Sequence, residues 1–213
     1  MKERNVLIID TTSEELFVAL IKDGGEVDKT YVSDCRSKHS VCLLPEIDGL
    51  LNRNGLKISD IGVCAISVGP GSFTGIRIGV ATAKAFQYAL DMKIIAVNSL
   101  EAAAYNYREK GKTLAIIDAK HGNAFSGVYE KGDERLCFLN TVGINEELKT
   151  TKNFISPYKN SFGATVIEDY YDNLVSVVKE KLEKKEFSEN FAPLYLKLSQ
   201  AEEEENDRKS LDV

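Results

Sequence analysis

The stretch Val-Leu-Ile-Ile-Asp at residues 6–10 decides the fold, because it returns as Leu-Ala-Ile-Ile-Asp at residues 114–118. The offset of 108 positions continues without a gap through a polar turn and a second apolar run, so that Gly24 matches Gly132. Apolar runs of this length predict buried strands, and the polar turn between them predicts a hairpin. The chain therefore contains an internal duplication, in which each half begins with a strand, an aspartate and a hairpin.

Strands and helices alternate between and after the two copies. The pattern predicts further strands at 27–33, 62–68, 94–97 and 136–142. It predicts helices at about 37–54, from the elbow at 69–75 to about Leu90, over 101–107 with Ser99 as its cap, near 145–148 and at about 170–185. Pro45 predicts a kink in the first helix. Residues 150–164 are predicted to be irregular, 192–196 to be a docked extended segment, and 202–208 to be a solvated charged tail.

The duplicated units resemble those that begin each half of the actin/hexokinase/Hsp70 fold. We therefore predict an actin-like, RNase-H-like (ASKHA) α/β fold. Its first lobe is expected at 1–110, and an abbreviated second lobe with a charged tail at 111–213, since a complete second lobe does not fit in the remaining length. Such a repeat supports a fold and says little about an activity.

Composition indicates an ordinary globular protein. Of the 213 residues, 43% are hydrophobic and 28% are charged. The chain has no apolar run of the roughly 20 residues that span a bilayer, and its start lacks the apolar region of a signal peptide, so we expect a cytoplasmic protein without membrane contact. A net charge of −6 argues against a protein that binds nucleic acid without a partner.

Several residues could belong to a metal or catalytic site, but each also has a structural interpretation. Cys35, His39 and Cys42 share a helical face, yet no spaced Cys or His supplies the fourth ligand of a zinc site. His39 lies at a helix start, where capping or packing is the favoured role, and His121 has no identifiable catalytic partner. We therefore predict no catalytic residue, metal or cofactor.

Asp10 and Asp118 occupy the strand ends where this fold places acidic residues beside a metal-bound nucleotide phosphate. The turn at 11–13 could donate hydroxyl or N–H groups to such an anion. Alternatively, each aspartate caps its own hairpin turn. Because much of the second lobe is missing, we favour capping.

The glycine-rich elbow at 69–75 fits neither a phosphate-binding P-loop nor a dinucleotide fingerprint, since its spacing matches neither motif. It predicts a tight strand-to-helix turn that Ser72 or Thr74 caps. Gly75, Gly79 and Ala83 then recur every four residues and leave one helical face bare. We expect another helix to approach this face, either the helix at 37–54 or one from another chain.

The stretch Ser67–Gly79 closely resembles the hallmark of the TsaB (YeaZ) family. The same resemblance extends to Ile9–Thr12, His39–Pro45, Asp118–Lys120 and Tyr195–Lys197. Lys197 stands where the family usually has arginine.

This resemblance implies a relative of TsaD, the enzyme that forms threonylcarbamoyladenosine at position 37 of tRNA. In TsaD, two histidines of a segment similar to Val-Asn-His-Leu-Glu-Ala-His provide part of the ligand set of the active-site metal. Residues 97–103 of this chain are Val-Asn-Ser-Leu-Glu-Ala-Ala, so Ser99 and Ala103 stand at the ligand positions. Serine is a poor ligand for a transition metal and alanine is none. The resemblance therefore implies a non-catalytic protein.

The resemblance also implies partners. Proteins like TsaB pair with a TsaD-like protein through the first two helices, self-associate through much the same surface, and join a TsaE-like ATPase in a larger complex that leaves tRNA mainly to other subunits. We predict that the shared interface is formed by residues of these two helices, some of which face the core instead. The candidates are Leu43, Ile47, Leu51, Ile76, Gly79, Val80 and Ala83. Two alternatives stay open: an independent nucleotide- or metal-dependent hydrolase of the actin-like superfamily, similar to a glycoprotease, and a free-standing structural homodimer.

Overall fold

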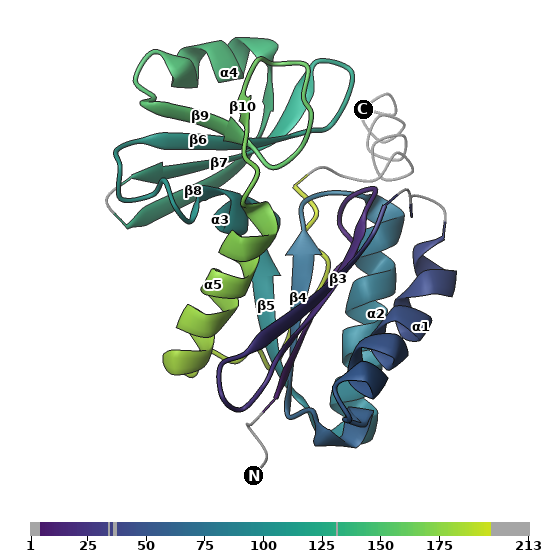
Figure 1. Cartoon of the computed structure of the whole chain (residues 1–213). Coiled ribbons are helices and arrows are strands. Elements are labelled where there is room, and N and C mark those ends of the chain that lie inside the picture. Colours follow the sequence, from purple (N-terminus) through teal and green to yellow (C-terminus); the bar gives the residue numbers. More distant parts are fainter. Residues whose placement is uncertain (1–4, 34, 36–37, 131, 197–213) are drawn as a thin grey trace, which may run out of the picture.

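The computed structural model describes residues 5–33, 35, 38–130 and 132–196, which form two sheets with helices packed on them (Figure 1). The first sheet has the order β3-β2-β1-β4-β5. Its strands are β1 Val6–Asp10, β2 Leu16–Ile21, β3 Val27–Val32, β4 Val63–Gly69 and β5 Lys93–Asn98. The strand β1 runs antiparallel to β2 and parallel to β4.

Helices cover both faces of this sheet, which explains why its central strands are apolar throughout. The helices α1 His39–Arg53 and α2 Phe73–Leu90 contact one face, where Leu7 and Ile9 are buried. The helices α3 Ser99–Ala104 and α5 Tyr170–Glu183 lie on the other face, where Ile8 is buried. Successive residues of β1 therefore enter two different cores.

The second sheet repeats the plan of the first and has the order β10-β9-β6-β7-β8. Its elements are β6 Thr113–Asp118, β7 Asn123–Glu130, β8 Asp133–Asn140, α4 Thr141–Leu148, β9 Asn153–Ser156 and β10 Thr165–Val166. As in the first half, β6 is antiparallel to its hairpin partner and parallel to the next strand. This topology confirms the predicted duplicated α/β fold. The second half is shorter because residues 157–164 join β9 to β10 without a helix.

Some predicted boundaries shift for local reasons. The helix expected near 145–148 begins at Thr141, because the Asn140 side chain caps it by accepting a hydrogen bond from Gly143 N at 2.9 Å. Asn98, rather than Ser99, caps α3 in the same way, with its Oδ1 atom 2.9 Å from Leu100 N. The strand β9 lies within the range predicted to be irregular.

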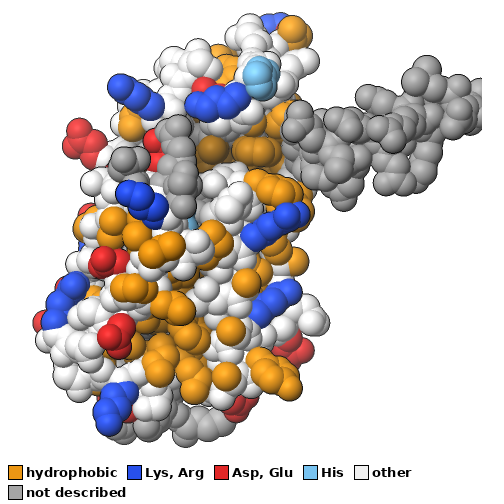
Figure 2. Space-filling view, turned by 90° about the vertical axis from the view of Figure 1, so that its right-hand side faces the viewer, with side chains coloured by type: hydrophobic (Ala, Val, Ile, Leu, Met, Phe, Trp, Pro, Cys, Tyr) orange, Lys and Arg blue, Asp and Glu red, His pale blue; other side chains and the backbone are white. Residues whose placement is uncertain are grey.

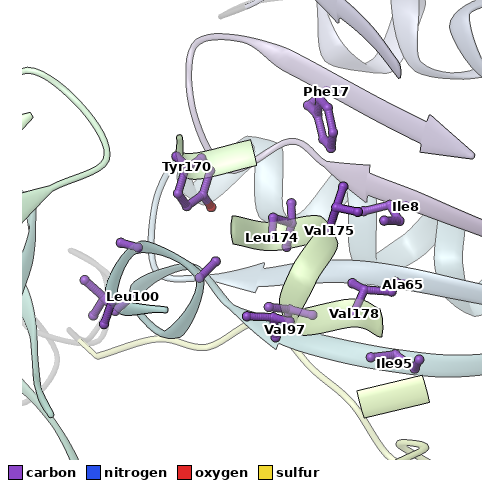
Figure 3. Packing of buried hydrophobic residues seen from close by; sticks show 14 of the residues in the cluster. Ile8, Phe17, Ala65, Ile95, Val97, Leu100, Tyr170, Leu174, Val175 and Val178 are labelled. Atoms are coloured by element: carbon purple, nitrogen blue, oxygen red, sulfur yellow. The ribbon is translucent and has the colours of Figure 1, made fainter. Parts of the chain in front are cut away.

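Residues 170–196 pack on the first sheet, although the prediction assigned 111–213 to a second lobe. The buried residues Leu174, Val175 and Val178 of α5 face Ile8, Ala65, Ile95 and Val97 of the first sheet (Figure 3). The following segment stays there too, because Ser188 N bonds to Ile94 O and Leu194 N to Val68 O, both at 2.8 Å. The docked segment predicted at 192–196 is thus confirmed, whereas the charged tail and Lys197 lie outside the described residues.

Within the described part of the chain, none of the helices combines the length and the apolar character that a membrane span requires.

An ion pair ties α1 to the edge strand β3 and provides a test by pH. The Arg53 Nε and Nη2 atoms each donate to Asp28 at 2.8 Å, and these bonds lower the pKa of Asp28 from its ordinary value of 3.8 to about 2. Because the pKa is lower in the folded state, the pair stabilises the fold above about pH 4 and loses this effect as the pH falls toward 2. We expect Asp28→Asn to lower the free energy of unfolding at pH 7, and to lower it much less at pH 2, where about half of the native carboxylate is protonated. Urea unfolding of both proteins at the two pH values measures this, and an equal difference at both would contradict it.

Candidate functional site

Asp10, at the end of β1, is buried, and both oxygens of its carboxylate accept hydrogen bonds. Asp10 is 1% exposed, and its Oδ1 atom accepts hydrogen bonds from Thr12 N and Thr12 Oγ1, both at 2.7 Å. Its Oδ2 atom accepts one from Tyr170 Oη at 2.9 Å. The aspartate therefore caps its own turn and joins it to α5.

The side-chain hydroxyl groups of this turn also donate hydrogen bonds to other groups of the protein. Thr11 Oγ1 donates to Gly75 O at 2.7 Å, and Ser13 Oγ donates to Glu15 O at 3.1 Å. Three tyrosine rings lie beside Asp10, with centroid distances of 5.4 Å between Tyr158 and Tyr170 and 5.1 Å between Tyr170 and Tyr171. Burial raises the pKa of Tyr170 well above its ordinary value, so the hydroxyl is a neutral donor to Asp10. The hydroxyl groups of Thr11, Thr12 and Ser13, which could have bound an anion, are thus paired with protein groups.

Asp118 caps the duplicated turn in the same way. Its Oδ1 atom accepts from Lys120 N at 2.7 Å, while its Oδ2 atom accepts from Ser161 N at 3.0 Å and Ser161 Oγ at 2.8 Å. Burial raises the pKa of Asp118, but the hydrogen bonds from Ser161 and Lys120 outweigh it and keep the pKa below the ordinary value. Both aspartates therefore have the capping geometry favoured by the sequence.

Ser99 and Ala103, at the positions of the metal ligands in the resemblance, belong to the interior. Both are 0% exposed. Ser99 Oγ lies 3.4 Å from Thr12 Oγ1, and Ala103 packs in the core shared by α3, α5 and the first sheet. Among the described residues there is no group of three or more His, Cys, Asp or Glu side chains placed to hold a metal ion. His39 is also buried, with Nε2 3.3 Å from Glu15 O, in agreement with a packing role.

The sequence predicts that the face of α2 that carries Gly75 and Gly79 contacts another helix, but this face packs on the first sheet. A Cβ atom on Gly75 would lie 1.9 Å from Thr11 O, and one on Gly79 would lie 2.5 Å from Thr11 Oγ1 and 2.8 Å from Ile66 Cδ1. The small residues therefore let α2 rest on the turn after β1 and on the sheet, rather than on another helix. Ser72 caps α2 as predicted, by accepting from Gly75 N at 3.2 Å.

The seven residues predicted for the interface lie in the core of the first lobe. The structure buries each of them against the sheet: Leu43, Ile47, Leu51, Ile76, Gly79, Val80 and Ala83. Apolar residues at helical spacing mark the face that packs on a sheet, so these side chains offer little surface to a partner, although Ile47 and Leu51 also line an open groove. Their role as partner contacts stays a prediction, as does the prediction that α1 and α2 carry the interface.

The outer side of the same two helices is apolar and exposed. On α1, Val41 is 71% and Leu44 is 56% exposed, and Pro45 lies next to them. On α2, Phe73 and Tyr88 are exposed by 41% and 95%. Figure 2 shows hydrophobic side chains gathered over this side of the first lobe. We call this the α1–α2 face, defined by Val41, Leu44, Pro45, Phe73, Arg77, Ala81, Lys84, Ala85 and Tyr88.

An open groove of about 340 Å³ adjoins the α1–α2 face, lined among others by Leu44, Asp48, Leu56 and Phe86. These exposed residues are not identified by the sequence, because the helical spacing of Val41 and Leu44 with Ile47, Leu50 and Leu51 predicts that all five share one apolar stripe. The structure buries Leu43 in place of Leu44 and leaves Val41, Leu44 and Pro45 exposed.

Taken together, the duplicated sheets, with a capped aspartate after the first strand of each, define a protein of the actin-like, RNase-H-like α/β class. Residues 33–160 match the family model described as TsaD: tRNA N6-adenosine threonylcarbamoyltransferase. The chain therefore belongs to the TsaD family, in which its similarity extends to proteins named TsaB (YeaZ).

Two curated relatives carry the name tRNA threonylcarbamoyladenosine biosynthesis protein TsaB. The protein from Bacillus subtilis is 36% identical over 126 residues, which cover 59% of this chain and 55% of the relative. The protein from Escherichia coli is 34% identical over 131 residues, covering 60% and 56%. The chain thus spans about half the length of the curated relatives it matches. In fold, it is similar to YeaZ from Pseudomonas aeruginosa, with a TM-score of 0.67 and 24% identity over 91% of this chain and 100% of that one.

Proposed function

We propose that this protein is a non-catalytic subunit for the threonylcarbamoylation of adenosine 37 in tRNA, and that it binds a TsaD-like catalytic protein through the α1–α2 face. Membership of the TsaD family and the names of the relatives support the pathway. The observation that carries the scaffold role is the exposed apolar surface of Val41, Leu44 and Phe73 on two rigidly packed helices. Contiguous exposed apolar surface of this kind marks interaction sites.

The absence of catalysis by this chain alone rests on the two sites described above. Ser99 and Ala103 are buried and provide no set of metal ligands. Asp10 directs both oxygens to Thr12 and Tyr170. The alternative, an independent nucleotide- or metal-dependent hydrolase, needs Asp10 free to bind a metal or a phosphate-bound metal. It therefore requires breaking the hydrogen bonds that join β1 to α5.

The same surface and the charge of the chain also support an assembly with further subunits. A specific interface buries about 800 Å² on each partner, and we expect the α1–α2 face and its groove to form the centre of such an interface. When the chain is alone, we expect a second copy to cover this face and form a homodimer. A net charge of −6 suits a subunit that leaves the tRNA mainly to its partners, including a TsaE-like ATPase.

The proposal predicts a heterodimer that depends on Leu44. We expect size-exclusion chromatography with light scattering to give the mass of a heterodimer when this protein is mixed with the TsaD-like protein of the same organism. Leu44→Arg should weaken binding by about 30-fold or more, because it places a charge in the centre of an apolar contact. Since Leu44 is 56% exposed, the variant should keep its fold.

The matched control is Val142→Arg, which changes an exposed apolar residue of α4 in the second lobe. Val142 is 68% exposed, so this variant should fold and bind like the unchanged protein. A mixture of the two unchanged proteins that elutes as separate species would refute the scaffold proposal, and ATP and metal titrations would then test the hydrolase. Equal losses in both variants would place the interface elsewhere.

A further inference from the structure

At the start of α2, the side chain of Arg77 lies over one aromatic ring and is hydrogen-bonded to the hydroxyl of a second. The Cζ atom of Arg77 is 3.8 Å from the centroid of the Phe73 ring and 5.7 Å from that of the Tyr195 ring. Arg77 Nε also donates a hydrogen bond to Tyr195 Oη at 2.7 Å, and the two ring centroids are 5.0 Å apart. The guanidinium plane is therefore fixed by stacking on Phe73 and by a hydrogen bond to Tyr195.

This arrangement is on the surface. Phe73 is 41% and Tyr195 is 44% exposed, and Arg77 is exposed as well. The Nε atom is taken by Tyr195, but within the described ranges no side chain or carbonyl accepts a hydrogen bond from the Nη1 and Nη2 atoms of Arg77. A fixed guanidinium with two free Nη groups is suited to bind a planar anion such as a carboxylate. Because the side chain is already ordered, little conformational entropy is lost on binding.

Arg77 is not needed merely to hold the C-terminal segment on α2. That segment is already anchored by the backbone bonds of Ser188 and Leu194 and by Phe191, which is 8% exposed in the core. Tyr195 thus reaches Arg77 from a segment that is fixed independently. The α1–α2 face therefore continues from the two helices onto Tyr195.

The surroundings favour a protein carboxylate over a phosphate of a nucleic acid. Arg77 and Lys84 are the only basic residues of α2, and Arg53 of α1 is paired with Asp28. Nucleic-acid binding needs several basic contacts, whereas exposed Phe, Tyr and Arg together with small apolar residues are typical of the centre of a protein interface.

We infer that Arg77 is the polar anchor of the α1–α2 face and that the protein partner places an acidic side chain against its guanidinium. This inference rests on the proposed function, since the partner is the TsaD-like protein. The Phe73 and Tyr195 rings orient Arg77 and flank the ion pair. The partner's carboxylate accepts hydrogen bonds from both Nη atoms.

The test compares the dissociation constant of the full chain and its TsaD-like partner, by isothermal titration calorimetry, for three variants. Arg77→Ala should raise the Kd by about 30-fold, and Arg77→Lys by about 10-fold, since lysine keeps the charge but not the planar fork. Lys110→Ala is the control, because it removes an exposed cation that lies over the Tyr107 ring outside the α1–α2 face, and its Kd should stay within about 3-fold of that of the unchanged protein. The Kd of the unchanged protein should rise with salt, and Arg77→Ala should lose much of this dependence.

The outcomes separate this inference from the proposed function. If the unchanged protein does not bind the TsaD-like protein, the proposed function fails. If it binds, and Arg77→Ala binds equally well with the same salt dependence, only the role of Arg77 is overturned. A lower melting temperature of Arg77→Ala with an unchanged Kd would assign Arg77 a structural role and also overturn the inference. An unchanged Kd together with weaker tRNA binding by the assembled complex would identify a phosphate as the ligand and refute the carboxylate.

Discussion

Replacing Gly75 with alanine should destabilise the protein by about 3 kcal/mol or more, because the new methyl group meets backbone that cannot retreat. A Cβ at this position would lie 1.9 Å from Thr11 O. The turn is held in place by Thr11 Oγ1, which donates to Gly75 O at 2.7 Å, and by Thr12 O, which accepts from Ser72 N at 2.6 Å. Relief of the clash requires lifting α2 from the sheet, which would open the core under the α1–α2 face.

Gly49→Ala is the matched control, since it makes the same change in the neighbouring helix. No atom lies within 4 Å of a Cβ built on Gly49, which is exposed on α1. This variant should be stabilised by up to about 1 kcal/mol through the higher helix propensity of alanine. Urea unfolding followed by circular dichroism measures both, as the chain contains no tryptophan for fluorescence. Equal midpoints for the two variants would contradict the close approach of α2 to the turn.

The fold was largely predictable because its main signals are local and repeated. The runs that end in Asp10 and Asp118 are apolar enough to mark strands buried on both faces, and their constant offset indicates a duplication. The return of α5 to the first sheet was not predictable in this way. Its apolar stripe, which includes Leu174 and Val178, shows that one face is buried but not which of two sheets covers it.

The same limit explains why the residues predicted for the interface are buried in the core. The spacing of Gly75, Gly79 and Ala83 shows that something approaches α2 closely, but only the structure identifies Thr11 and Ile66 as its neighbours. Likewise, apolar residues at helical spacing are first of all those of the core. The arrangement of Phe73, Arg77 and Tyr195 could not be predicted, because it joins α2 to a segment more than 100 positions away in the sequence.

Replacing Tyr170 with alanine should have the other large effect, a loss of about 4 kcal/mol. Tyr170 is 2% exposed at the start of α5, its ring packs against those of Tyr158 and Tyr171, and its hydroxyl donates to Asp10 at 2.9 Å. The alanine variant leaves a cavity between the two lobes and a buried carboxylate oxygen that has lost a donor. Tyr170→Phe removes only the hydroxyl and should cost about 2 kcal/mol.

The comparison of the two variants separates the ring from the hydrogen bond. Tyr88→Ala removes the same side chain from a position that is 95% exposed and should change the free energy of unfolding by less than about 0.5 kcal/mol. If Tyr170→Phe is as stable as the unchanged protein, then Thr12 alone satisfies Asp10 and the lobes are joined by ring packing. If Tyr170→Phe loses about half of the stability that Tyr170→Ala loses, the Asp10 carboxylate is a structural acceptor that joins β1 to α5. That result would also explain why the chain can serve as a rigid surface, because opening the space beside Asp10 would then require breaking the contact between its two lobes.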